Sequence, residues 1–151
     1  MTDNPIELLK EEHTLIRKAV TGIQELLAGK TLDAGLFAER AHSLARLLAL
    51  HERREDDVLF PAVGTMGPVQ LVMQEHAHLS ALLDNMNQAL ANFANDGGDE
   101  ACNKLKVAFD EVAYCLAGHL MKEEQMAFRM AEGMISPEQF PDMLERMRAI
   151  G

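Results

Sequence analysis

Two histidine–glutamate pairs in this chain have the spacing of metal ligands on a helix. His51 and Glu55 are four residues apart, and His119 and Glu123 repeat that spacing nearer the other end of the sequence. Residues four apart project from one face of a helix, one turn from each other. Imidazole nitrogen and carboxylate oxygen without thiolate favour iron, manganese or zinc over copper(I) or iron–sulfur chemistry. The two pairs therefore indicate a metal site.

Two further histidines, His13 and His76, lie inside otherwise apolar helical patterns. His13 occupies a position where leucine would be expected, in a seam that recurs every three or four residues: Ile6, Leu9, His13, Ile16, Val20, Ile23 and Leu27. Such a seam is typical of a helix that packs against other helices. A lone histidine on an apolar face is usually a core residue with a hydrogen-bond partner. Four such histidines beside two glutamates favour metal binding instead.

The same patterns predict an all-α fold. Four long helices are expected at about residues 4–29, 33–59, 69–95 and 99–132, with a turn and a short terminal helix at about 136–150. Pro61 is expected to stop the second helix. The fourth is expected to point Met126 and Met130 inward. Short connections predict an antiparallel up-down-up-down four-helix bundle with a C-terminal helical extension, in which residues 1–151 form a single domain.

Alternating helix directions bring the candidate ligands to one level of this bundle. Measured along each helix, the four histidines and Glu123 lie roughly 12–18 Å from the same end, and Glu55 lies one turn from His51. Burying a carboxylate without a partner lowers the free energy of unfolding by several kcal/mol, and two such carboxylates could unfold a marginally stable domain. A bound dication removes that cost. We therefore predict a metal site formed by one set of residues: His13, His51, Glu55, His76, His119 and Glu123.

Composition and charge argue against several other classes of function. The net charge of −10 disfavours nucleic acid and anionic membrane surfaces as partners. No apolar run approaches the roughly 20 residues that span a bilayer, and no signal peptide is visible. Cys102 and Cys115 lie about 20 Å apart on one expected helix, too far to bridge. Free thiols fit a cytoplasmic location.

Other polar residues near the candidate ligands are expected to be peripheral. His42 and His78 should be surface or supporting groups, because they point away from the ligand faces of their helices. Tyr114 is expected to pack in the core. The glutamates adjoining the ligands in sequence are expected to be solvated: Glu12, Glu52, Glu75 and Glu124.

The ordered motifs of this chain resemble the hemerythrin-like, HHE cation-binding domain family. They are His13, His51-x-x-x-Glu55 followed by Leu59-Phe60-Pro61, Glu75-His76, and His119-x-x-x-Glu123. The resemblance covers nearly the whole chain. It implies two non-haem irons with a bridging oxo or hydroxo group, zinc or manganese being alternatives. The histidines would then be terminal ligands, and the two glutamates would bridge the metals.

One difference from the oxygen-carrying hemerythrins bears on function. Those proteins have another histidine one turn from a third-helix ligand, where this chain has Val72 and Ser80. Of about twelve coordination positions on two irons, about two would then be open rather than one. We therefore expect binding, sensing or redox processing of a small ligand, namely oxygen, nitric oxide or peroxide.

Other functions and assemblies are also compatible with the sequence. One is an iron donor or store of the iron-centre repair type, and another is a structural bundle with zinc or no metal. Whether the protein is an enzyme is left open. The apolar face of the terminal helix would either cover the bundle or dock a second subunit in a homodimer.

Overall fold

A computed structural model describes residues 2–151, which form helices and contain no strand. The α-helices are α1 (Pro5–Leu27), α2 (Ala34–Arg54), α3 (Phe60–Val63), α4 (Pro68–Asp96), α5 (Asp99–Lys122), α6 (Phe128–Met134) and α7 (Phe140–Ala149). Two π-helical turns, η1 (Glu55–Leu59) and η2 (Glu123–Ala127), join α2 to α3 and α5 to α6. A 3₁₀ turn, η3 (Pro137–Gln139), precedes α7. None of the helices in the described part is long and apolar enough to cross a membrane.

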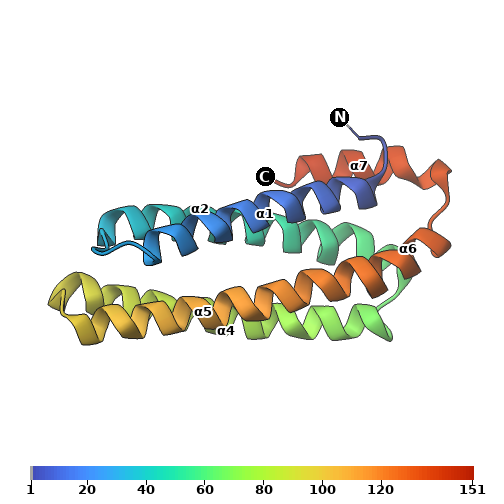
Figure 1. The fold of residues 1–151 in the computed structure, drawn as a ribbon. Helices are drawn as coiled ribbons and strands as arrows, with labels where there is room; N and C mark the ends of the chain where they lie inside the picture. Colours follow the sequence, from blue (N-terminus) through green and yellow to red (C-terminus); the bar gives the residue numbers. More distant parts are fainter. Residues whose placement is uncertain (1) are drawn as a thin grey trace.

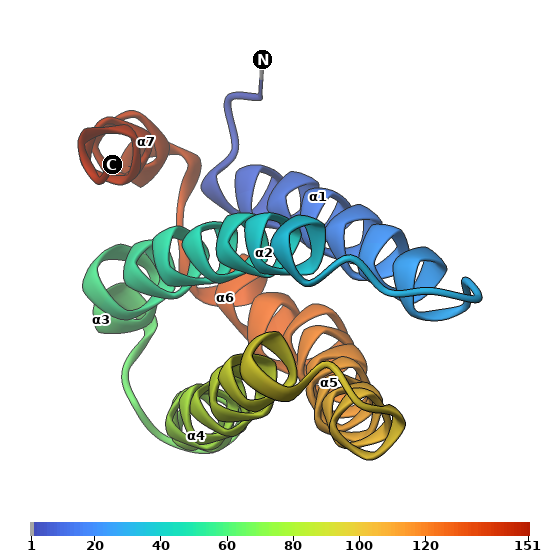
Figure 2. The same ribbon diagram turned by 90° about the vertical axis from the view of Figure 1, so that its left-hand side faces the viewer.

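The long helices form a bundle of two pairs (Figure 1). α1 lies beside α2, α4 lies beside α5, and contacts between α2 and α4 and between α1 and α5 join the pairs. Figure 2 shows α7 beside α1, and α7 also contacts η1, at the end of the bundle where the chain begins. The all-helical bundle predicted from the sequence is confirmed.

Local sequence signals define the helix ends. The Asn4 side chain accepts a hydrogen bond from the Ile6 amide at 2.8 Å and so caps the start of α1. Asp33 caps α2 in the same way, through the Leu36 amide at 3.1 Å. Gly97 ends α4 with a φ of 68°, a left-handed conformation that glycine adopts without steric cost.

The prediction that Pro61 stops the second helix is wrong. The chain stays helical through η1 and α3 as far as Val63, and Pro61 lies in the first turn of α3, where proline is tolerated. Proline has no amide hydrogen to give to the Asp57 carbonyl four residues earlier. Arg146 of α7 donates to that carbonyl instead, at 3.3 Å.

The apolar core consists of two clusters with the candidate ligands between them. The larger cluster fills the far end of the bundle and includes Phe37 and Phe109. The smaller cluster lies at the end covered by α7 and includes Met143 and Met147. The terminal helix therefore covers the bundle, which is one of the two arrangements expected for it.

One predicted core position is wrong for a reason that the π turn explains. Met126 was expected to point inward but is 44% exposed. The wider turn of η2 shifts the inward face by one residue, so that Ala127 and Ala131 are buried in its place.

Candidate metal centre

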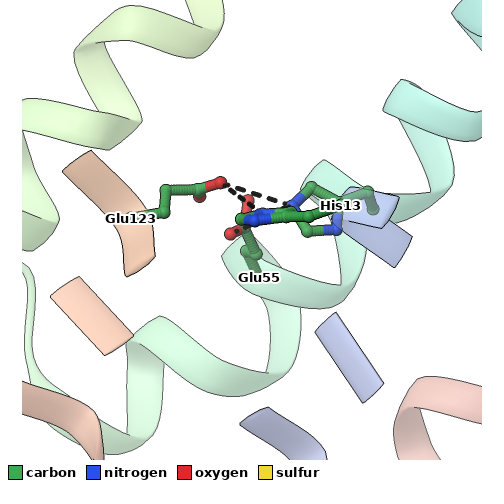
Figure 3. A group of neighbouring side chains, drawn as sticks. His13, Glu55 and Glu123 are labelled. Carbon is green, nitrogen blue, oxygen red and sulfur yellow. Dashed lines mark hydrogen bonds and ion pairs between the residues drawn. The ribbon is translucent and has the colours of Figure 1, made fainter. Parts of the chain in front are cut away.

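The structure brings all six predicted ligands together in the interior. His13, Glu55 and Glu123 are completely buried, and His76, the most exposed of the set, retains 7% of its accessible surface. Figure 3 shows Glu123 and His13 pointing toward each other above Glu55. That these residues bind metal stays a prediction, but their positions meet its geometric requirement.

The donor atoms fall into two overlapping groups, each with ligand atoms within 4.8 Å of one another. The first group is His13, His51, Glu55 and Glu123, and the second is Glu55, His76, His119 and Glu123. Each group has two histidines of its own and shares both glutamates with the other. This is the arrangement expected of two cation positions joined by carboxylates.

Distances within the first group are short. The His13 and His51 Nε2 atoms are 3.0 Å apart, and His13 Nε2 is also 3.0 Å from Glu123 Oε1. His51 Nε2 is 3.3 Å from Glu55 Oε2.

The second group is slightly more open. His76 Nε2 is 3.3 Å from Glu55 Oε1, and His119 Nε2 is 3.5 Å from Glu123 Oε1. In both groups the Nε2 atoms approach the shared carboxylates, and each Nδ1 faces outward.

Each of the two shared glutamates begins a π turn. The Phe60 amide donates to the Glu55 carbonyl, and the Phe128 amide donates to the Glu123 carbonyl, in both cases five residues back. π turns inside α-helices are rare and are frequently found at functional sites. Here the turn lets two consecutive acidic residues serve the centre: Glu55 faces the shared interior and Asp56 reaches His76.

Four further carboxylates support the histidines from outside. Each carboxylate accepts a hydrogen bond from Nδ1 of one histidine. The pairs are Glu124 with His13 at 2.5 Å, Glu12 with His51 at 3.1 Å, Asp56 with His76 at 3.2 Å and Glu75 with His119 at 3.1 Å. Such a bond fixes the tautomer and the ring orientation, leaving Nε2 free for a metal.

The prediction that the adjoining glutamates are solvated is therefore wrong for three of them. Glu12, Glu75 and Glu124 support histidines, and Glu52 is half-buried. A signal was present in the sequence, because Glu12 and Glu75 each directly precede a candidate histidine. Helical periodicity places them off the ligand face, but each reaches the histidine of a neighbouring helix.

Cationic side chains in turn hold three of these carboxylates. Arg54 binds Glu12, Lys122 binds Glu75, and Arg17 Nη1 lies 2.9 Å from Glu124 Oε2. Arg54 also donates to the Met147 carbonyl at 2.9 Å. The support of His51 therefore extends to the end of α7.

Several buried polar atoms of the centre have no hydrogen-bond partner within the described chain. Five of them belong to predicted ligands: both Glu55 carboxylate oxygens, Glu123 Oε2, His76 Nε2 and His119 Nε2. Leaving such groups unsatisfied costs about 1–3 kcal/mol each, and more for charged groups. Cations between them would satisfy all five. The donor set therefore fits a metal, on grounds of both geometry and chemistry.

The pKa values show how strongly charges interact here. Burial opposes ionisation of both partners, yet Glu55 holds the pKa of His51 well above its usual range, and His51 holds the pKa of Glu55 well below its own. Burial also opposes the His76 charge, but the hydrogen bond to Asp56 and the nearby negative charge of Glu55 raise its pKa to about 10. An incoming metal must displace these protons.

The remaining predicted residues lie apart from the centre. His42 and His78 are exposed, as expected for surface groups. Tyr114, expected in the core, is 86% exposed, so that prediction is wrong. Cys102 and Cys115 are free thiols, as predicted.

Comparison with known proteins identifies the family. The model of the hemerythrin HHE cation-binding domain matches residues 1–66 and 67–150, almost the entire chain. A search among curated proteins finds no match. Each matched segment contributes two of the buried histidines and one shared glutamate. The chain belongs to the hemerythrin HHE cation-binding domain family.

Proposed function

We propose that this protein holds two iron ions in an antiparallel up-down-up-down four-helix bundle and binds, senses or redox-processes a small ligand there. His13 and His51 would bind one ion, and His76 and His119 the other. Glu55 and Glu123 would bridge the pair. The ligand would be oxygen, nitric oxide or peroxide.

The observation that carries this proposal is the set of buried donors without partners. Five nitrogen and oxygen atoms of the predicted ligands are sealed from solvent and lack any hydrogen bond within residues 2–151. A bundle selected only for stability would satisfy such atoms or replace them with apolar groups. Their nitrogen and oxygen chemistry suits iron, with manganese and zinc as the nearest competitors.

The chain and the metal would divide the work. Iron, when bound, supplies ligand binding and electron transfer to the small molecule. The outer carboxylates hold each imidazole in the tautomer that leaves Nε2 free to bind. The apolar clusters on both sides exclude bulk water from the layer of donors. Four histidines and two bridging carboxylates leave part of the coordination of two irons open to the ligand.

Metal content and an absorption spectrum test the proposal directly. Protein produced in iron-supplemented cells should contain close to two irons per chain. The reduced protein should change its near-ultraviolet spectrum on exposure to oxygen, nitric oxide or peroxide. One zinc per chain would contradict the proposal, as would two irons whose spectrum responds to none of the three molecules.

The same sample distinguishes an iron donor from a resident centre. An iron donor should lose its metal quickly to a weak chelator. Burial of all six donors at 7% exposure or less favours a resident centre, because a chelator cannot reach the ions without movement of the chain. Rapid loss of both irons would make the donor function the better one.

A further inference from the structure

The two metal positions have matching donors but different outer support. Behind His13, the Glu124 carboxylate is held by Arg17 at 2.9 Å. Behind His76, the Asp56 carboxylate forms no ion pair with any lysine or arginine of residues 2–151. The Oδ1 atom of Asp56 is buried and has no hydrogen-bond partner there either.

The sequence explains why one outer carboxylate has a cationic partner and the other does not, through the residue that follows each histidine by one helical turn. Arg17 lies four residues after His13 on α1, one turn along the same face. Ser80 lies four residues after His76 on α4 and carries no charge that could pair with a carboxylate. The carboxylates behind the other two histidines each have a cationic partner, since Arg54 binds Glu12 and Lys122 binds Glu75. Within the described chain, only the carboxylate behind His76 lacks such a partner.

Ring packing differs in the same direction. The His13 ring stacks on Phe128 with centroids 5.3 Å apart and is completely buried. The rings of His13 and His76 each also meet a partner ligand, His51 at 4.7 Å and His119 at 4.9 Å. No aromatic ring of the described chain stacks on His76 as Phe128 does on His13. His76 also retains 7% of its accessible surface, the most of the four histidines. Its ring is therefore less restrained and closer to solvent than that of His13.

These three differences point to unequal metal exchange. We propose that the ion held by His76 and His119 exchanges faster than the ion held by His13 and His51, and that Arg17 and Ser80 set the difference. Metal loss begins when a ligand ring detaches and rotates away. Stacking and a fixed Nδ1 acceptor return the His13 ring to its place, whereas Asp56 restrains His76 less. The inference rests on the proposed function only in requiring two bound ions.

Release of cobalt measures the two positions separately. Protein loaded with two Co²⁺ ions is mixed with excess EDTA, and the visible absorption of bound Co²⁺ is followed over time. We expect two phases of about equal amplitude. The fast phase would report the His76 position and the slow phase the His13 position.

Reciprocal variants assign the phases. Arg17→Ser should speed the slow phase about tenfold, the lower end of the usual effect of removing outer-shell support. Ser80→Arg should slow the fast phase by a similar factor. Aspartate is shorter than glutamate. The double variant Asp56→Glu/Ser80→Arg therefore gives His76 the same outer pair, a glutamate and an arginine, that Glu124 and Arg17 provide to His13. Ser80→Gln, which adds length without charge, is the matched control and should leave both phases unchanged.

The outcomes separate this inference from the proposed function. Two tightly bound Co²⁺ ions released in a single phase overturn the inference alone. So does an Arg17→Ser variant that speeds only the fast phase, or a fast phase that neither arginine-bearing variant slows. A chain that binds fewer than two Co²⁺ ions overturns the proposed function and the inference with it.

Discussion

The far end of the bundle and the layer of candidate ligands represent opposite ways of filling a protein interior. At the far end, Phe37 meets Phe109 edge to face at 6.1 Å within a cluster of aliphatic side chains. That packing is complete without a ligand. The ligand layer instead buries two carboxylates and four histidines, several of whose polar atoms lack partners in the described chain. The first region contributes stability. The second lowers it, because it buries polar donor atoms that only a bound metal would satisfy.

The largest expected effect on the ligand layer comes from replacing the two shared carboxylates. Replacing both Glu55 and Glu123 with glutamine removes the two anions that would bridge the cations, while nearly preserving side-chain volume. We expect stoichiometric metal binding to be lost, as measured by metal content after equilibration with iron or Co²⁺. For the native protein, metal at a hundred times its Kd should add about 2.7 kcal/mol to the free energy of unfolding. The double variant should show no such gain.

A purely structural centre predicts a different result for the same variant. Its stability would be unchanged or higher, because two buried charges have been removed without losing a ligand. Retained stoichiometric metal binding would exclude Glu55 and Glu123 as ligands.

A substitution at the far end should have the reverse effect. Phe109 is completely buried, so Phe109→Ala should lower the free energy of unfolding by about 3–5 kcal/mol. Metal stoichiometry should not change, because no candidate ligand lies in that cluster. Denaturant unfolding and metal analysis of the same sample check both expectations. Val107→Ala is the control: Val107 is on the same helix but 58% exposed, and its replacement should cost little.

A smaller effect is expected where the ligand layer meets α7. Arg54 binds Glu12, which supports His51, and also donates to the Met147 carbonyl. Arg54→Gln should lower metal affinity about tenfold and increase hydrogen exchange in α7. Competition with a chromophoric chelator and mass-detected exchange measure these effects.

The neighbouring arginine is a suitable control for that variant. Arg53 is 63% exposed and lies 3.9 Å from Asp57, so Arg53→Gln should change neither metal affinity nor exchange in α7. Equal effects of the two substitutions would mean that Arg54 acts through general charge rather than through Glu12.

Helical periodicity and local ending signals predicted much of this architecture. The seam of α1 and the expected starts of α1 and α2 near residues 4 and 33 depend on contacts between near neighbours in sequence, which a sequence displays directly. The six candidate ligands could be brought together because each occupies an apolar seam, and seams must face the interior. The π turns were missed because Met126 and Met130 continue the regular helical spacing after Glu123, so that no sign of the inserted residue is visible in the sequence.

The outer carboxylates were missed for a different reason. Glu12 and Glu75 project between helices, where the partner depends on how neighbouring helices are placed rather than on the periodicity of their own helix. The same holds for the pairing of Arg17 with Glu124. Tyr114 shows the converse error, because an aromatic residue in an apolar helix need not face the core.

The finest test of the contrast between the two regions is pH. In the metal-free protein the pKa of His76 is raised to about 10 by Asp56 and Glu55 against the opposing effect of burial, compared with 6.5 for an ordinary histidine. A raised pKa adds stability that is fully present below pH 6.5 and is lost as the pH rises through 10. Between pH 7.5 and 8.5 the free energy of unfolding of the metal-free protein should therefore fall by about 1.4 kcal/mol because of this group.

Metal affinity should change in the opposite direction, rising up to tenfold per displaced proton, because binding requires neutral imidazole. Thermal melts of metal-free protein and chelator competition at both pH values measure the two trends. Phe109→Ala should reproduce both slopes from a lower starting stability, whereas a flat metal affinity across this range would show that the metal does not displace the His76 proton.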